Sequence, residues 1–241
     1  MRAVTWTPLI TGTVGSHAYG LATPTSDMDT LGVAAAPTEA FHGLHAPTGK
    51  AATQVSTDPD VAVHEAGKFV SLCLSANPTV TELLWLPEDC YQEVHPLGRE
   101  LIALRGSLLG AERVRNAYLG YATQQFRRLR DRGTSFSSNT AKRTEKHARH
   151  LLRLVRAGMS LYLAGELPVR VDDPQEYHDF GRTVAEDAER GLALAEATLA
   201  AAGMAMDSKP SALPDEPDKR AAEAWLLRVR AHFFQTAGVA A

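Results

Sequence analysis

Short apolar runs separated by turn-forming residues occupy the chain up to about residue 90. Runs of this length, in which apolar and polar residues alternate, are typical of β-strands. They predict strands over residues 6–14, 29–35 and 60–64. A short helix is predicted over residues 16–22, and an amphipathic helix opens at Glu65 and runs to residue 74. Asn77 followed by Pro78 is a favourable start for another helix.

From about residue 97 the apolar positions recur with the period of a helix. The pattern predicts helices over residues 97–109, 113–132, 140–164 and 180–202, with a polar loop at 133–139. A last helix is expected after Asp218, and it carries Trp225. The chain is therefore predicted to have an α+β fold, with a small α/β domain over residues 1–92 and a helical domain over residues 93–241.

Composition and charge narrow the class of protein only slightly. The chain has 241 residues and a formal net charge of −3, so its total charge indicates no particular partner. Its two cysteines, Cys73 and Cys90, match neither a disulfide framework nor a metal-binding pattern. No apolar run is long enough to cross a bilayer, and no signal peptide is visible. We expect a cytoplasmic protein with reduced thiols, without membrane contact; the oligomeric state stays open.

Candidate chemistry is concentrated between the first two predicted strands. Gly15 and Ser16 form a turn at the end of the first apolar run, and Asp27 and Asp29 precede the second. Residues two apart on a strand point to the same side, so both carboxylates would face one point. A hard divalent cation offsets the repulsion between two such carboxylates. Backbone amides at a glycine-containing helix start bind phosphate, so the stretch has the layout of a nucleotide site, although each half on its own is common in surface turns.

A second concentration of charge lies on the helix predicted over residues 140–164. Five cationic residues recur there at intervals of three and four and share one face: Lys142, Lys146, Arg149, Arg153 and Arg156. The preceding helix adds four arginines to this region: Arg127, Arg128, Arg130 and Arg132. Like charges stacked on one face repel, and a bound polyanion would relieve that repulsion. The face is therefore interpreted either as a phosphate or nucleic-acid contact or as an ordinary solvated surface.

The stretch from Gly15 to Asp29 resembles the signature of the DNA polymerase beta nucleotidyltransferase superfamily. The sequence GSHAYGLATPTSDMD is similar, more narrowly, to nucleotidyltransferases described as RNA-ligase-associated. Two later stretches fit the same branch: Lys68-Phe69 with NPTVTELL from residue 77, and KHARHLLRL from residue 146 running on to GELPV from residue 165. The resemblance extends over about residues 8–170.

This resemblance implies a polymerase beta-like mixed-sheet domain whose cleft the helical domain completes. It implies a third carboxylate on a later strand, for which Asp60 is the candidate, with Glu65 as the alternative. It also favours Lys146, His150 and Arg153 as residues that face the nucleotide, together with Gly15 and Ser16.

The expected activity is transfer of a nucleoside monophosphate from a nucleoside triphosphate, such as ATP, to a hydroxyl acceptor, with an RNA end as one candidate. Asp27, Asp29 and Asp60 would hold Mg²⁺ or Mn²⁺ and carry the catalysis. Two alternatives stay open: nucleotidylation of a protein or small molecule, and a nucleotide- or nucleic-acid-binding module without turnover.

Overall fold

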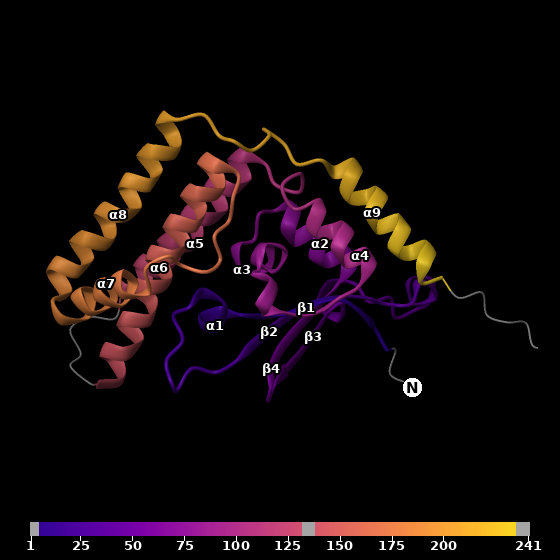
Figure 1. The fold of residues 1–241 in the computed structure, drawn as a ribbon, viewed down its shortest axis with the longest axis horizontal. Helices are drawn as coiled ribbons and strands as arrows, with labels where there is room; N and C mark the ends of the chain where they lie inside the picture. The colour runs from indigo at the N-terminus through magenta and orange to yellow at the C-terminus, as the bar shows by residue number, and fades with distance from the viewer. Residues whose placement is uncertain (1–4, 132–137, 235–241) are drawn as a thin grey trace, which may run out of the picture.

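The structure is a computed structural model, and it describes residues 5–131 and 138–234. Its centre is a mixed sheet of five strands, seen edge-on at the lower middle of Figure 1. The strand order is β3-β4-β2-β1-β5, and β2 with β4 is the parallel pair. The bounds are Thr7–Val14 for β1, Asp29–Ala35 for β2, Thr53–Thr57 for β3, Asp60–Glu65 for β4 and Tyr91–Val94 for β5.

The apolar runs of the sequence explain why β1 and β2 form the middle of this sheet. Leu9 and Ile10 of β1 are completely buried, and β2 is buried from Leu31 to its end. Helix α4 (Pro96–Ala103) approaches β1 so closely that a Cβ on Gly98 would lie 2.1 Å from the carbonyl oxygen of Leu9. Close contact of this kind fixes the sheet against the helices above it.

Helices α2 (Ala66–Leu74), α3 (Pro78–Thr81), α4 and α9 (Lys219–His232) lie together above the sheet in Figure 1. The first helix, α1 (Gly15–Tyr19), lies at the opposite end of the sheet from α9. Short 3₁₀ segments connect these elements: η1 (Thr38–His42), η2 (Gly49–Ala52), η3 (Glu82–Trp85) and η4 (Glu88–Cys90). The predicted helix starts at Glu65 and Asn77 are confirmed, because both side chains accept backbone hydrogen bonds from the first turn of their helices.

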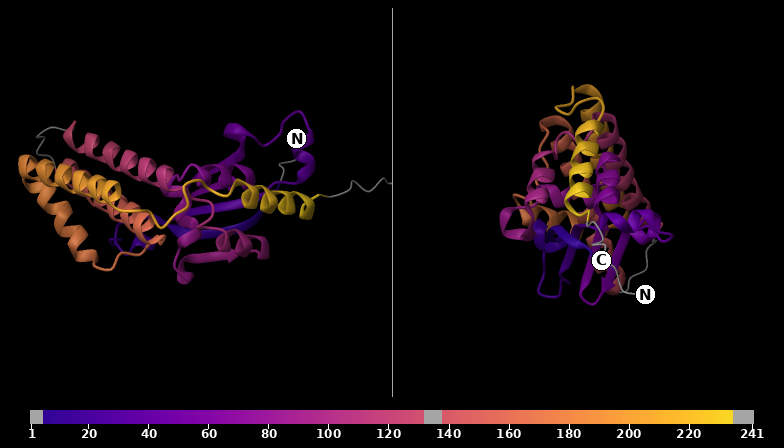
Figure 2. Two further views of the ribbon diagram at one scale, coloured as in Figure 1. Left: turned by 90° about the horizontal axis from the view of Figure 1, so that it is seen from above. Right: turned by 90° about the vertical axis from the view of Figure 1, so that its right-hand side faces the viewer.

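The remaining helices form a bundle beside the sheet, along the long axis of the molecule (Figure 2). They are α5 (Ala111–Arg130), α6 (Ser138–Ala164), α7 (Pro174–Glu186) and α8 (Ala188–Ser208). The chain then returns to the sheet, where the indole Nε1 of Trp225 in α9 donates to the carbonyl oxygen of Leu97 at 2.8 Å. The α+β prediction, a mixed sheet followed by helices, is confirmed. The predicted domain boundary at residue 92 falls inside β5.

Several details of the predicted elements are wrong. The helix predicted over residues 180–202 is two helices, because Asp187 has an extended backbone that ends α7 and its side chain caps α8. The helix predicted over residues 97–109 ends at Ala103, and the sequence pattern predicts neither strand β3 nor strand β5. Most of the predicted loop at 133–139 lies outside the described residues, and its last two positions belong to α6. Among the described residues, no helix combines the length and apolar character needed to cross a membrane.

Candidate active site

The turn between β1 and α1 lies directly against the carboxylate of Asp29. Gly15 has a φ of +69°, a conformation that favours glycine. A Cβ placed on it would lie 2.3 Å from Oδ2 of Asp29. The backbone of the turn therefore occupies the space that a side chain would need, and the carboxylate sits against the start of α1.

The parallel pairing of β2 with β4 brings Asp60 beside Asp29. The two are register partners and each is the first residue of its strand, so both carboxylates emerge at the same end of the sheet. Asp27 lies two residues before β2 and is exposed. Glu65 lies at the other end of β4, where it is 2 % exposed, caps α2 and pairs with Arg230 at 2.6 Å. The structure thus brings Asp27, Asp29 and Asp60 to one end of the sheet and holds Glu65 elsewhere.

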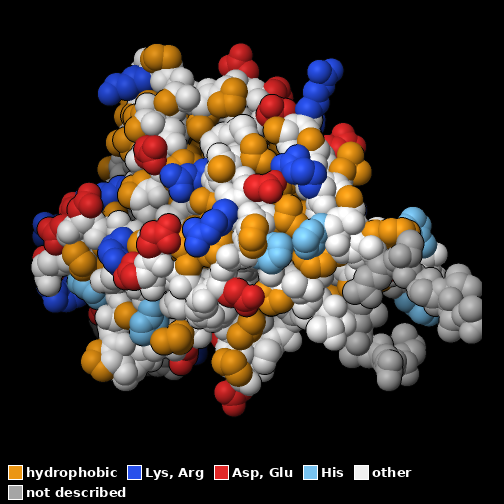
Figure 3. Space-filling model, turned by 45° about the vertical axis from the view of Figure 1, so that its right-hand side comes forward, with side chains coloured by type: hydrophobic (Ala, Val, Ile, Leu, Met, Phe, Trp, Pro, Cys, Tyr) orange, Lys and Arg blue, Asp and Glu red, His pale blue; other side chains and the backbone are white. Residues whose placement is uncertain are grey.

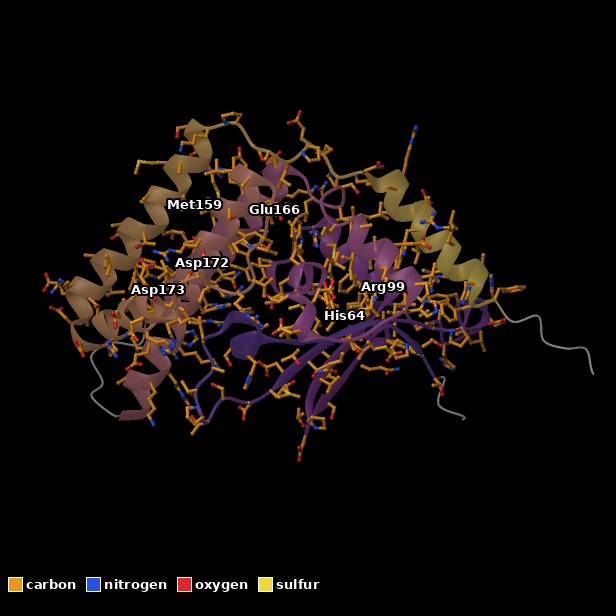
Figure 4. The ribbon with its side chains drawn as sticks, viewed as in Figure 1. His64, Arg99, Met159, Glu166, Asp172 and Asp173 are labelled. Atoms are coloured by element: carbon orange, nitrogen blue, oxygen red, sulfur yellow. The ribbon has the colours of Figure 1, made fainter. Side chains whose placement is uncertain are left out.

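The position of His64 shows that the other end of β4 points away from α1. Figure 4 shows His64, four residues after Asp60, lying along the sheet towards α9 and away from α1, on the same side as Arg99 of α4. The Nδ1 of His64 lies 3.0 Å from Oγ1 of Thr53 on β3. Burial lowers the pKa of His64, and the charge of Lys68 lowers it further. Lys68 donates hydrogen bonds to Oγ1 of Thr53 and to the carbonyl oxygen of Gly49, so this end of the sheet has a polar cluster of its own.

Electrostatics tie these acids to helix α6. Burial raises the pKa of Asp29, and the carboxylates of Asp60 and Asp27 raise it further. The charges of Lys146 and His17 oppose that rise. Lys146 belongs to α6, so the helical bundle supplies a cation to the aspartates at the sheet end.

The donor chemistry of this end of the sheet fits a hard divalent cation. Asp60 and Asp27 raise the pKa of Asp29, so the three carboxylates gain from a nearby positive charge, and carboxylate oxygens are preferred ligands of Mg²⁺ and Mn²⁺. Within the described residues, however, no group of three or more His, Cys, Asp or Glu side chains is already arranged closely enough to hold a metal ion. The three carboxylates therefore share one end of the sheet without forming a ready-made ligand set among the described side chains.

Ser16 lies in the first turn of α1, which begins without a side-chain cap from Val14. The first amides of a helix have no partner inside the helix, so this turn presents N–H donors next to the aspartates. Two contacts fix its position from the other side. The amide of Leu21 donates to the carbonyl oxygen of Ser16 at 2.9 Å, and Nε2 of His17 lies 3.2 Å from the carbonyl oxygen of Ser26.

From Arg149 onward, the cationic face that the sequence predicts on α6 is paired with acidic side chains. Arg153 is only 4 % exposed and its Nη1 lies 3.1 Å from Oε2 of Glu82. Arg149 lies 3.8 Å from Glu145, and Arg156 pairs with Glu176 of α7. Acidic side chains thus neutralise much of the face that the sequence presents as a row of cations.

Two candidate side chains in the first half of α6 differ in their exposure. Lys146 is exposed, and His150, one turn later, is largely buried. Burial, together with the charges of Arg153, His147 and other nearby cations, lowers the pKa of His150 to about 3. His150 is therefore neutral at physiological pH, so it can donate or accept a hydrogen bond but brings no positive charge.

Sequence reasoning missed two residues that connect the site to the bundle. The hydroxyl of Tyr19 donates to Oε1 of Glu82 at 2.7 Å, and Glu82 is 3 % exposed. The guanidinium carbon of Arg153 lies 3.8 Å from the centre of the Tyr19 ring. Both residues stand in stretches that carried the family resemblance, and a glutamate within the apolar run TELLW was the available signal.

On the face shown in Figure 3, acidic and basic side chains are interspersed rather than separated. Most of the described ion pairs are exposed, such as Arg228 with Glu100 and Arg170 with Asp89. Two pairs have a carboxylate that is nearly inaccessible, Arg153 with Glu82 and Arg230 with Glu65. The first of these adjoins the candidate site, and the second fastens α9 to the far end of the sheet.

Comparison with known proteins agrees with this geometry. No curated protein matches the chain. Residues 8–199 match a family described as RNA repair pathway DNA polymerase beta family, a range that includes the glycine turn, the three aspartates and the whole of α6. The chain therefore belongs to the RNA repair pathway DNA polymerase beta family of nucleotidyltransferases.

Proposed function

We propose that this protein transfers a nucleoside monophosphate from a nucleoside triphosphate to a hydroxyl group at an RNA end. The observation that carries the proposal is the register of Asp29 with Asp60, because it places two strand-start carboxylates beside the glycine turn. Family membership supports nucleotidyl transfer and a link to RNA repair.

The reaction exchanges one phosphorus–oxygen bond for another. The oxygen of the acceptor hydroxyl attacks the α-phosphorus, the bond from that phosphorus to the oxygen bridging to the β-phosphate breaks, and pyrophosphate leaves. Asp60 is exposed at the start of β4 and would accept the proton of the attacking hydroxyl. Asp27, Asp29 and Asp60 would hold Mg²⁺ or Mn²⁺, which when bound lowers the cost of the charge that builds on the transferring phosphate.

The remaining contacts to the triphosphate come from the turn and from α6. The backbone amides of Gly15 and Ser16 would bind the phosphates, because they lie at the start of a helix. Their position next to Asp29 would put the phosphates beside the carboxylates. Lys146 would offset the charge of the departing pyrophosphate, since it already acts electrostatically on Asp29. His150 would contribute at most a neutral hydrogen bond, and Arg153 would act from beneath the site rather than by touching the nucleotide.

Substitution of the aspartates tests the proposal. In Asp27→Asn and Asp29→Asn, we expect transfer of α-labelled ATP to an RNA oligonucleotide to be lost while the thermal unfolding transition persists. Asp58→Asn is the matched control, because Asp58 lies in the exposed turn just before Asp60. Wild-type turnover in Asp29→Asn would refute the assignment of this site.

The choice of acceptor separates the proposal from its alternatives. The same labelled ATP is offered with an RNA oligonucleotide, with a protein mixture and with an aminoglycoside. Label on RNA supports the proposal, and label only on protein or on the small molecule replaces its acceptor. If no acceptor and no added Mg²⁺ or Mn²⁺ elicits pyrophosphate release, the chain is a binding module without turnover.

A further inference from the structure

A buried polar network joins the glycine turn to the helical bundle. Glu82, at the start of η3, accepts hydrogen bonds from the hydroxyl of Tyr19 at 2.7 Å and from Nη1 of Arg153 at 3.1 Å. The Arg153 guanidinium also stacks on the Tyr19 ring, with 3.8 Å between its central carbon and the ring centre. Each of the three residues therefore contacts the other two, from three elements that are far apart in the sequence.

The charged groups of this network are buried, so forming it costs hydration free energy. The side chains of Arg153 and Glu82 are 5 % and 4 % exposed, so both ions have lost their hydration. Nε and Nη2 of Arg153 are buried and have no hydrogen-bond partner among the described residues. A buried ion pair of this kind is often no more stable than well-packed apolar side chains of similar volume. Stability is therefore a weak reason for charged residues at these positions.

The placement of the network suggests a better reason. Tyr19 is the last residue of α1, the five-residue helix that begins at Gly15 and carries the turn assigned to phosphate. Arg153 lies two turns after Lys146 on the same face of α6. Burial raises the pKa of Glu82, and Asp29 is near enough for its charge to contribute to that rise. The three side chains therefore lie between the turn, the aspartates and the helix that supplies Lys146.

The cavity beside Arg153 lies farther along α6 than Lys146, against residues 153–160. It has a volume of about 340 Å³, and Arg153, Arg156 and Tyr177 line it together with Asp172 and Asp173. Figure 4 shows these two aspartates beside α6, where the chain approaches α7. None of the three site aspartates lines this cavity. Arg153 thus stands between the cavity and the site, which fits a supporting role better than contact with a nucleotide.

We propose that Tyr19, Glu82 and Arg153 are positioning residues, which lock α1 to α6 and so hold the Gly15–Ser16 turn at a fixed place relative to Lys146. The inference rests on the proposed function of the turn. It also changes the role of Arg153, which the sequence assigns to the nucleotide itself. By holding α1 in place, the Tyr19 hydroxyl would fix the position of the bound nucleotide without contacting it.

Tyr19→Phe tests the hydroxyl alone. It leaves the ring under Arg153 and removes the hydrogen bond to Glu82. We expect KM for ATP to rise by about tenfold while KM for an RNA oligonucleotide stays nearly unchanged. The melting temperature should fall by only a few degrees, because the buried Oε1 of Glu82 loses its donor. Tyr91→Phe is the matched control, since it removes a hydroxyl that donates to the Leu83 carbonyl oxygen at 3.0 Å. Equal effects of the two variants on KM for ATP would overturn the proposal.

A triple variant, Tyr19→Phe with Glu82→Leu and Arg153→Met, separates positioning from folding. Single removal of either ion would leave its partner buried without a counter-charge and could unfold the protein, whereas the triple variant removes the whole network. We expect its melting temperature to equal or exceed that of the parent, and kcat/KM for ATP to fall by about a hundredfold. A stable triple variant with parental kcat/KM would refute the positioning role of the network.

Hydrogen exchange keeps the inference testable even if the proposed function fails. Amides of residues 16–21 should exchange faster in Tyr19→Phe than in the parent or in Tyr91→Phe, while the amides of β1 keep their protection. Faster exchange in this variant, with a parent protein that transfers no nucleotide, would refute the proposed function and support the positioning of α1. Unchanged exchange at residues 16–21 would refute the positioning itself.

Discussion

The substitution Gly15→Ala has two separate consequences, one for stability and one for activity. The first is backbone strain, because an alanine at a φ of +69° costs about 1–2 kcal/mol relative to a glycine. The second is a steric conflict, because the new Cβ would lie 2.3 Å from Oδ2 and 3.2 Å from Cγ of Asp29. Only rotation of that carboxylate relieves the conflict. Rotation is cheap for folding but moves a group that the chemistry needs in place.

The expected result follows from these two terms. The free energy of unfolding should fall by about 1–2 kcal/mol from the strain alone. Transfer of label from ATP to RNA should fall by about a hundredfold, the effect of a displacement of the order of 1 Å at a reacting centre. Urea denaturation measures the first quantity, and steady-state release of pyrophosphate measures the second.

Two other glycines provide controls with the same strain and no conflict. Gly20 has a φ of +74°, and a Cβ there would approach nothing nearer than Cγ of Arg170 at 3.7 Å. Gly49 has a φ of +57°, and a Cβ there would have nothing within 4 Å among the described residues. Their alanine variants should lose similar stability and keep their turnover. If Gly20→Ala and Gly15→Ala lose the same activity, contact between the turn and Asp29 is not what supports transfer.

Four further substitutions test the electrostatics. Asp29→Asn removes an acid whose pKa is raised by burial and by neighbouring carboxylates. The ionised form therefore opposes folding, so the variant should be more stable than the parent at neutral pH. This difference in stability should vanish as the pH falls through the raised pKa towards 3.8. Urea titrations across that pH range measure it, and a difference that grows in acid would contradict the reasoning. Lys146→Met should raise KM for ATP by about tenfold without a change in melting temperature, as steady-state kinetics would show. Arg230→Ala should cost about 3 kcal/mol of unfolding free energy, because it strands the buried carboxylate of Glu65, whereas Arg228→Ala breaks an exposed pair and should cost less than about 1 kcal/mol in the same denaturation assay.

Helix starts and strands that depend on residues close together in the chain are predicted correctly from the sequence. Asn77 is predicted to start a helix, and its Oδ1 accepts from the amides of Thr79 and Val80 at 3.2 and 3.3 Å. Strand β2 is predicted with its observed bounds, since its apolar run is continuous and a proline follows it. Capping and apolar runs act within a few residues, so a single sequence contains all that is needed to recognise them.

Prediction fails where charges meet across the fold. Helical spacing correctly places Lys146 and Arg153 on one face of α6, but it cannot show that Glu82, 71 residues earlier, neutralises the second of them. Asp187 is misread for a related reason. In an alanine-rich stretch it resembles a solvated helix position, whereas its backbone is extended and its side chain caps α8. Both errors come from reading a polar residue by its local spacing when its partner determines its role.

The choice between Asp60 and Glu65 shows why the register of the sheet, rather than either residue type, determines the composition of the site. The two residues are five positions apart on β4, so they face opposite sides of the sheet and lie about 16 Å apart along it. The local sequence pattern does not distinguish the two residues, because each is an acid at one end of the same apolar run. The pairing of β4 with β2 decides between them: it sets Asp60 opposite Asp29 and Glu65 opposite Ala34, where Glu65 caps α2 and pairs with Arg230. A shift of this register by one residue would move Asp60 to the other face, away from Asp29 and the turn, while leaving every local signal in the sequence unchanged. The parallel pairing of β2 with β4 is therefore what makes three separated aspartates into one candidate site.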